Sequence, residues 1–297
     1  MPRPVAALLS SLPAGIHTYD KGGTLRRHLY GLAAVVLLLT LAPQPAAHAV
    51  PPIPSSMASL GDSITRGFNA NGWFVDHPSR SFSTGDNSTV NSHYLRIKSK
   101  NSAITGKNFN YATSGAEMID LNAQVQNAVN AGVQYVTIEL GANDVCASTE
   151  AGMTPVATYR SQLDQALATL KAGLPNAAVA VISIPSVYRL WDIGKNSSSA
   201  RSAWSGYNIC QSMLANPQST AQADVDRRNR VRQRNIDFNT QLEQACTAYG
   251  ANCDFDGNAV FNYPFALSHM SSWDYFHPNT SGQAVLAQQS YANGFNW

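Results

Sequence analysis

Short apolar runs alternate with longer helical patterns along the chain from residue 50 onward. The runs with β character are MASL at 57–60, NFNYA at 108–112, YVTIEL at 135–140, AVAVISI at 178–184 and a weaker one around CDFDG at 253–257. Strands that alternate with helices form a parallel sheet covered by helices on both faces, with right-handed crossovers. The pattern therefore predicts an α/β fold.

The helical patterns have recognisable ends. The clearest one has Thr154 as its expected N-cap and Pro155 at the first helical position, and it stops at Gly173. Further helices are expected over 118–130, 222–249 and 281–292. The apolar face of the helix that begins at Pro155 consists of Val156, Tyr159, Leu163, Leu167 and Leu170.

Residues 1–49 differ from the rest of the chain. The pair Arg26-Arg27 precedes the apolar stretch GLAAVVLLLTLA, which is followed by PQPAAHA. This stretch is shorter than the roughly 20 residues that a membrane helix needs, and the A-x-A ending suits cleavage between Ala49 and Val50. We expect a signal peptide and a single mature domain over 50–297, with an uncleaved anchor as the alternative. The arginine pair also resembles a twin-arginine signal, although Sec export is favoured.

Charge and composition narrow the class of protein. The 297 residues are 13% charged and 44% hydrophobic, which is typical of a globular protein. Residues 1–49 hold four of the 20 basic and one of the 18 acidic residues, so the mature part has 16 and 17, a net charge of −1. The basic run DRRNRVRQR at 226–234 lies within a helical pattern and is interpreted as a solvated helix face. No nucleic-acid partner is expected.

All four cysteines lie in the exported part of the chain. An even number outside the cell indicates two disulfides, for which three pairings exist. Cys246 with Cys253 is favoured because these residues flank a helix end and a short turn, and Cys146 would then join Cys210. The spacing lacks a C-x-x-C or a paired histidine, so no metal site is expected.

Polar residues follow several of the predicted strands. Ligands of α/β sheets bind at this place, beyond the carboxyl ends of the strands. Ser63 follows the first strand, and Asp274 and His277 occur in WDYFHPN near the C-terminus. A serine nucleophile needs a histidine base and a carboxylate that orients the imidazole. Ser63, His277 and Asp274 are therefore the candidate catalytic residues.

An acyl-transfer site also needs donors for the oxyanion. Gly115 permits close approach of its backbone N–H, Asn143 offers an amide, and Ser63 offers its own N–H. Each of these residues alone could instead form a turn or a cap, and it is their order after successive strands that is specific. His93 and His269 lack a carboxylate three residues earlier and are interpreted as ordinary histidines.

The four blocks GDSITRG, ATSGAE, GANDVC and DYFHPN resemble those of the SGNH serine hydrolases, also called GDSL esterases and lipases. The resemblance implies a three-layer α/β/α sandwich with a flavodoxin-like, five-stranded parallel sheet. It implies Ser63 as nucleophile, His277 as base and Asp274 as its partner, with Gly115 and Asn143 in the oxyanion hole and a structural role for Asp62. No metal or organic cofactor is required. The absence of G-x-S-x-G argues against the other large α/β-hydrolase class.

Within that family, SRSFSTGDNSTVNSHYLRI and the cysteine after GAND are similar to the phospholipase B-like branch. The stretch 186–220 is an insertion whose aromatic residues either line an acyl or sugar pocket or pack structurally. We expect a secreted, monomeric hydrolase of lipid or phospholipid acyl esters with transient lipid-interface contact. A carbohydrate acetyl esterase is the alternative, and a non-catalytic surface-binding protein on the same fold is a further one. The insertion aromatics are Tyr188, Trp191, Trp204 and Tyr207.

Overall fold

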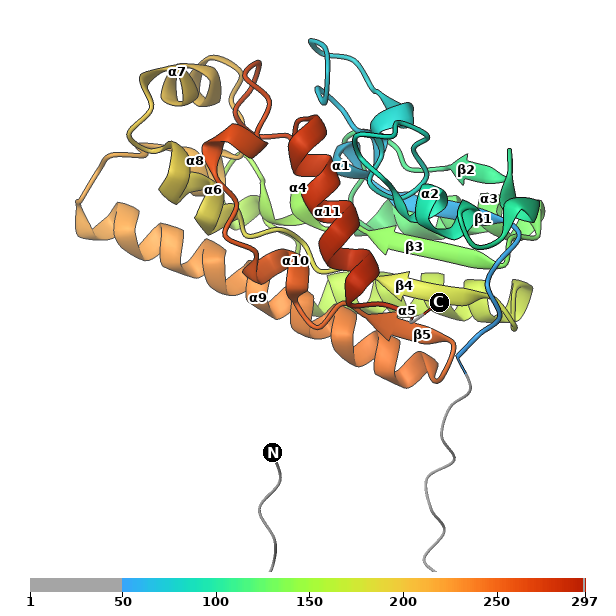
Figure 1. The fold of residues 1–297 in the computed structure, drawn as a ribbon. Helices are drawn as coiled ribbons and strands as arrows, with labels where there is room; N and C mark the ends of the chain where they lie inside the picture. The colour runs from blue at the N-terminus through green and yellow to red at the C-terminus, as the bar shows by residue number, and fades with distance from the viewer. Residues whose placement is uncertain (1–49, 296) are drawn as a thin grey trace, which may run out of the picture. The chain divides into compact units, whose positions relative to one another are not determined.

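The computed structural model describes residues 50–295 and 297, so the signal peptide expected at 1–49 lies outside the described residues. The described chain forms one five-stranded parallel sheet with the order β2-β1-β3-β4-β5 (Figure 1). This confirms the predicted α/β fold and its five strands. The strands are β1 (Met57–Gly61), β2 (Asn108–Asn110), β3 (Tyr135–Glu139), β4 (Ala178–Val181) and β5 (Cys253–Phe255).

The helices lie on both faces of the sheet (Figure 1). The long helices α3, α5 and α9 pack against one another on one face, and α2 and α11 lie on the other. The helices are α1 (Ser63–Arg66), α2 (His93–Lys98), α3 (Leu121–Ala131), α4 (Ala142–Val145), α5 (Val156–Gly173), α6 (Val187–Gly194), α7 (Ser198–Gly206), α8 (Gln211–Leu214), α9 (Gln222–Tyr249), α10 (Ala259–Asn262) and α11 (Thr280–Ala292).

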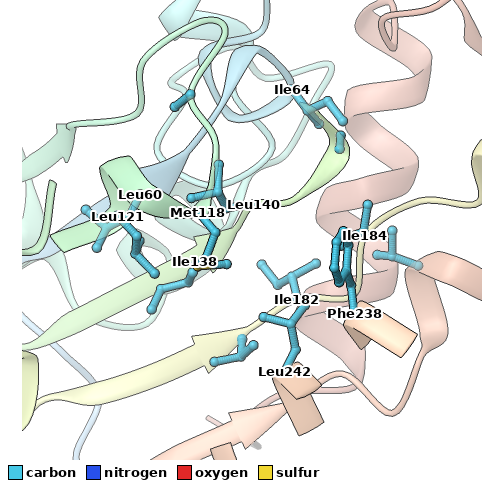
Figure 2. Packing of buried hydrophobic residues seen from close by; sticks show 14 of the residues in the cluster. Leu60, Ile64, Met118, Leu121, Ile138, Leu140, Ile182, Ile184, Phe238 and Leu242 are labelled. Atoms are coloured by element: carbon cyan, nitrogen blue, oxygen red, sulfur yellow. The ribbon is translucent and has the colours of Figure 1, made fainter. Parts of the chain in front are cut away.

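The core divides according to the two-residue period of the strands, because successive side chains point to opposite faces. Leu60 of β1 and Ile138 of β3 face the α3, α5 and α9 layer, whereas Met57 and Tyr135 of the same strands face α2 and α11. Figure 2 shows Leu60 and Ile138 grouped with Leu121 of α3. Both faces of β1 and β3 are therefore buried, as is typical of the strands of parallel sheets.

The strand order places a topological switch point at β1. β2 and β3 are the two neighbours of β1 in the sheet. The chain therefore passes from β1 to β2 in one direction along the sheet and from β2 to β3 in the opposite direction. Ligands of open α/β sheets bind where the connections diverge in this way, beyond the carboxyl ends of the strands. The segments that follow β1 and β3 are thus the ones that form the site.

The predicted start of α5 is wrong by one position. Pro155 is the N-cap, with ψ 140°, and its carbonyl accepts the first helical bond from Tyr159 N–H. Thr154 lies one position before the N-cap, and no side chain among the described residues caps the helix; the backbone N–H of Thr154 donates to the carbonyl of Asp144. The helix ends expected at 130 and 249 agree with the structure to within one residue, since α3 ends at Ala131 and α9 at Tyr249.

The basic run of 226–234 lies on α9, and several of its arginines form hydrogen bonds or ion pairs with other segments of the protein. Arg227 donates to the carbonyls of Ser212 and Ala215, and Arg230 pairs with Glu150. Arg234 donates to the carbonyl of Thr154. These contacts give the run a structural role. Within the part of the chain that the structure describes, no helix has the length and apolarity to cross a membrane.

Candidate active site

Ser63 lies at the junction between β1 and α1, where the chain leaves the sheet. Asp62 caps α1, with its Oδ1 accepting the N–H of Ile64 at 2.8 Å. Gly61 has a φ of 154°, and a Cβ there would lie 2.2 Å from the carbonyl oxygen of Glu139, so this close approach of β1 to β3 requires glycine. The tight turn places the Ser63 hydroxyl at the carboxyl end of the sheet.

Residues from the C-terminal part of the sequence lie next to this hydroxyl. Ser63 Oγ lies 2.9 Å from His277 Nε2, and His277 Nδ1 lies 2.6 Å from Asp274 Oδ2. Asp274 Oδ1 also accepts the backbone N–H groups of Phe276 and His277, at 2.9 and 3.0 Å. This turn fixes the carboxylate and the imidazole on the same side of the backbone, as the D-x-x-H spacing predicts.

The electrostatics favour an ionised carboxylate beside the imidazole. Burial acts to raise the pKa of Asp274, but the hydrogen bond and charge of His277 and the donors of Phe276 and Asn69 hold that pKa below its ordinary value. An ionised Asp274 holds the Nδ1–H tautomer and leaves Nε2 free to take a proton from Ser63.

Asn69 is a residue of the site that the sequence analysis did not identify. Its Nδ2 donates to Asp274 Oδ2 at 2.5 Å, and its Oδ1 accepts the N–H of Phe74 at 2.6 Å. Asn69 is buried and has a φ of 56°, a conformation that asparagine tolerates better than most residues. The dipeptide Asn71-Gly72 signals a turn near this point, but nothing in the sequence pattern links position 69 to Asp274.

The two oxyanion candidates line the same cleft as Ser63 and His277, a cleft of about 270 Å³. Gly115 follows β2 with a φ of 88°, and Asn143 lies in α4, directly after β3. Asn143 Nδ2 donates one hydrogen to the carbonyl of Ala116 at 2.8 Å. This bond holds the amide beside the cleft, and one amide hydrogen remains for a ligand.

Three buried carboxyl groups lie near one another around Asp62, the residue before Ser63. Burial raises the pKa of Asp62 to about 7, and it raises the pKa of Glu139 well above its usual value. Burial also raises the pKa of Asp144 to about 6, although its Oδ2 accepts the N–H of Met118. Asp62 therefore acts as the cap of α1, and the carboxylate that contacts the imidazole of His277 is Asp274.

The remaining histidines singled out above lie elsewhere. His93 is buried, with Nδ1 at 2.8 Å from the hydroxyl of Tyr135 and Nε2 at 2.7 Å from Ser290 Oγ. Burial lowers its pKa to about 3, so the ring stays neutral in the core. His269 Nδ1 accepts the N–H of Ala266 in a short turn. Neither residue lines the cleft that holds Ser63.

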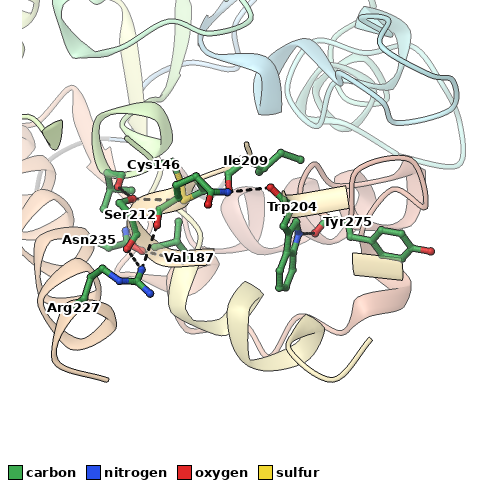
Figure 3. Close-up of a disulfide and its surroundings, with 11 residues drawn as sticks. Cys146, Val187, Trp204, Ile209, Ser212, Arg227, Asn235 and Tyr275 are labelled. Atoms are coloured by element: carbon green, nitrogen blue, oxygen red, sulfur yellow. Dashed lines mark hydrogen bonds between the residues drawn. A yellow bond between two sulfur atoms is a disulfide. The ribbon is translucent and has the colours of Figure 1, made fainter. Parts of the chain in front are cut away.

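One wall of the cleft comes from the stretch 186–220. The structure contains the Cys146–Cys210 and Cys246–Cys253 disulfides, and the first of these lines the cleft with Ile209. Figure 3 shows this disulfide near Ser212, whose backbone carbonyl accepts a hydrogen bond from the Arg227 side chain. The disulfide joins α4, which carries Asn143, to the start of α8.

The four aromatic residues of this stretch do not line the cleft. Trp204 is buried and donates its Nε1–H to the carbonyl of Tyr275 at 3.0 Å (Figure 3). Trp191 donates to the carbonyl of Pro217 and lies under the side chains of Lys195 and Arg228. Tyr188 packs against Trp191, whereas Tyr207 is exposed. Packing is thus the role of three of the four.

Comparisons with known proteins agree with the fold and show the family. Residues 57–290 match the family model of the GDSL-like lipase/acylhydrolase. A search of curated proteins finds no match. Among solved structures, a GDSL-like lipase from Parabacteroides merdae is similar over 80% of this chain and 94% of its own, with a TM-score of 0.50 and 17% identity.

Two further structures are similar at lower scores. An extracellular lipase from Streptomyces rimosus has a TM-score of 0.45 and 20% identity, with 80% of this chain and 96% of that chain covered. A family 3 carbohydrate esterase from Clostridium thermocellum has a TM-score of 0.48 and 14% identity, with 80% and 93% covered. The family model spans residues 57–290 of the 297, and the chain therefore belongs to the GDSL-like lipase/acylhydrolase family, whose members are carboxylic ester hydrolases.

Proposed function

We propose that the protein is a secreted serine hydrolase that cleaves lipid or phospholipid acyl esters through an acyl-enzyme intermediate. The observation that carries the catalytic part is the continuous hydrogen-bonded path from Ser63 through His277 to Asp274, at 2.9 and 2.6 Å. Export is supported by the apolar segment ahead of residue 50 and by the two disulfides, which persist in oxidising compartments.

The proposed reaction has two displacements. Ser63 Oγ attacks the ester carbonyl carbon while His277 Nε2 takes the hydroxyl proton, and Asp274 stabilises the imidazolium that forms. Asn143 Nδ2 and the backbone N–H groups of Gly115 and Ser63 receive the oxyanion. The tetrahedral intermediate collapses as His277 returns the proton to the leaving alcohol. Water, activated by the same imidazole, then hydrolyses the acyl-enzyme.

The preference for lipid acyl groups is supported by apolar surfaces beside the nucleophile. Phe68, Ile209 and Phe276 line the cleft around Ser63. Phe276 also lines a second, mostly apolar cavity, together with Leu190 of α6. Apolar surface of this kind favours a hydrocarbon chain over a sugar ring, because transfer of methylene groups out of water is favourable.

The first test is labelling with a fluorophosphonate probe, in which Ser63→Ala serves as the control. Labelling of the parent and none of Ser63→Ala is the expected result. An unlabelled parent would show a non-catalytic protein on this fold.

The second test compares p-nitrophenyl esters of increasing acyl length with acetylated xylan. The proposal expects kcat/KM to rise from acetate towards medium or long chains. Hydrolysis of acetylated xylan together with a fall in kcat/KM beyond acetate would instead identify a carbohydrate acetyl esterase.

A further inference from the structure

Large apolar side chains gather at one place on the surface. The described residues include nine exposed side chains of this type, five of which come from segments that lie together. Trp73 stacks on Trp273 at 5.9 Å, and Phe74 contacts Trp73 at 5.4 Å and Tyr207 at 5.2 Å. Contiguous exposed apolar surface marks interaction sites in soluble proteins. The aromatic rim consists of Trp73, Phe74, Val75, Tyr207 and Trp273, each about half exposed.

The aromatic rim borders the entrance of the active-site cleft. Phe74 packs edge-on against Phe68 at 6.0 Å, and Phe68 contacts the ring of His277 at 4.8 Å. Phe68 lines the cleft, as does Ile209, which follows Tyr207 by two residues. A molecule that lies on the rim therefore lies beside the opening that leads to the nucleophile.

The loop that carries Trp73 and Phe74 is fixed to the domain. Asn69 accepts the N–H of Phe74, and the carbonyl of Ala70 accepts both the N–H and the hydroxyl of Thr280, at 3.0 and 2.9 Å. Phe74 has a φ of 48°, a strained conformation for an aromatic residue. Strained backbone conformations of this kind persist where the surrounding structure fixes them, and they are common at functional sites. Here the strained conformation accompanies an aromatic side chain that is exposed to solvent.

The charge around the aromatic rim limits what can lie on it. The segments 67–75, 205–209 and 271–273 contain no Lys, Arg, Asp or Glu. Asp76, at the base of the loop, is paired with Arg66 at 3.0 Å and accepts the hydroxyl of Ser114. The rim thus offers apolar and aromatic surface without formal charge, and it complements a surface that carries no net charge.

We propose that the aromatic rim is the surface by which the protein docks onto a lipid–water interface of zwitterionic headgroups, such as phosphatidylcholine. Tryptophan and tyrosine rings suit the headgroup level because they are amphipathic, and phenylalanine inserts among the acyl chains. A polysaccharide fits less well, since Trp73 and Trp273 each turn one ring face toward the other and Phe74 and Val75 have no polar atoms in their side chains. The inference rests on the proposed function in that docking presents the ester to Ser63.

The binding test uses the Ser63→Ala mature chain, so that it does not depend on turnover. Sedimentation with phosphatidylcholine vesicles compares it with the same chain carrying Trp73→Ser and Trp273→Ser. Bound protein is expected to fall by at least about 10-fold, because two interfacial side chains are lost. Raising the salt concentration should change binding little. The matched control is Phe109→Ser, an exposed aromatic on the edge strand β2, which should bind like its parent.

Several outcomes would overturn the inference. These are a parent that does not bind the vesicles, a double variant that binds as well as the parent, and binding that requires anionic lipid. Binding of the parent to insoluble xylan, lost in the double variant without any vesicle binding, would identify a sugar surface instead. Thermal unfolding of the double variant near that of the parent shows that the loss is not a folding defect.

A second measurement separates docking from catalysis. With Ser63 intact, the ratio of hydrolysis of emulsified ester to hydrolysis of a soluble short ester should fall in Trp73→Ser/Trp273→Ser and stay constant in Phe109→Ser. An unchanged ratio contradicts docking even if the enzyme is active. Vesicle binding in a chain that hydrolyses no ester would support the docking surface and contradict the proposed function.

Discussion

Asn69 and His277 donate to the same oxygen of Asp274. The Asn69 amide nitrogen lies 2.5 Å from Asp274 Oδ2, and His277 Nδ1 lies 2.6 Å from it. The loop after Ser63 is thereby joined to the C-terminal turn that carries His277. Because Oδ1 is held by two backbone N–H groups, the carboxylate has little freedom to rotate away from the imidazole.

Replacing Asn69 with alanine should lower kcat by about 10-fold with little change in KM. The reason is that a hydrogen bond to a charged group contributes about 1.5–3 kcal/mol, part of which positions Asp274 for the imidazolium. Rates are to be expressed per active site, titrated with a fluorophosphonate probe. Asn69→Asp should lower kcat further, because it removes the donor and adds a second negative charge beside Asp274.

Asn71→Ala is the matched control for this prediction, since Asn71 lies exposed in the same loop. It should retain kcat and KM. If Asn69→Ala lowers only the titrated fraction of active enzyme, and the rate per active site stays at the parental value, Asn69 supports the fold and does not position Asp274.

Asn143→Ala should lower kcat by about 10²–10³-fold if its amide stabilises the oxyanion. The substitution also removes the bond to the Ala116 carbonyl, so the melting temperature must be measured with the kinetics. Asn110→Ala serves as the comparison, because Asn110 also donates to a backbone carbonyl, that of Thr65, and does not line the cleft. A kcat for Asn143→Ala equal to that of Asn110→Ala would remove Asn143 from the oxyanion hole.

The sequence was sufficient to predict the five strands and the residues that follow them. Buried parallel strands produce apolar runs that need no tertiary information to recognise. The position of Ser63, Gly115 and Asn143 at strand ends then follows from the topology of α/β sheets, which brings such ends together. The D-x-x-H turn is local, so the relation between Asp274 and His277 could be inferred from their spacing alone.

Contacts between distant segments could not be predicted in this way. Asn69 reaches Asp274 across 205 residues, and only the folded loop brings them together. The aromatic residues of 186–220 have the composition of a pocket lining, but the positions of Trp204 and Trp191 depend on hydrogen bonds to the carbonyls of Tyr275 and Pro217. The arginines of α9 likewise acquire their role from carbonyl groups that other segments present to them.

The two disulfides should differ in their contribution to stability. Cys146 and Cys210 are separated by 64 residues in sequence, and Cys246 and Cys253 by seven. By the loop-entropy relation, the longer loop gives about 2 kcal/mol more stabilisation than the shorter one. Urea unfolding of Cys146→Ser/Cys210→Ser and Cys246→Ser/Cys253→Ser should therefore show the greater loss for the first pair. Equal losses would mean that native packing, and not the unfolded chain, decides the effect.

Asp62 should make the folded protein less stable as the pH rises from about 4 to 7. Burial raises its pKa from 3.8 to about 7, so in this range the folded state binds more protons than the unfolded state. The free energy of unfolding falls with pH wherever that is so. The stabilisation is complete below pH 4 and is lost as the pH passes the folded pKa. Glu139 and Asp144 act in the same direction.

His93 acts in the opposite direction, because burial lowers its pKa to about 3 and the unfolded chain binds the extra proton. The prediction therefore concerns the difference between a variant and its parent. Asp62→Asn keeps an oxygen to accept the Ile64 N–H and carries no titratable group. Its free energy of unfolding, measured by urea at intervals from pH 4 to 8, should fall less steeply than that of the parent. Asp86→Asn, a change at an exposed carboxylate, should leave the slope as in the parent. If Asp62→Asn also kept the parental slope, the buried carboxyl at position 62 would not be what links proton binding to folding.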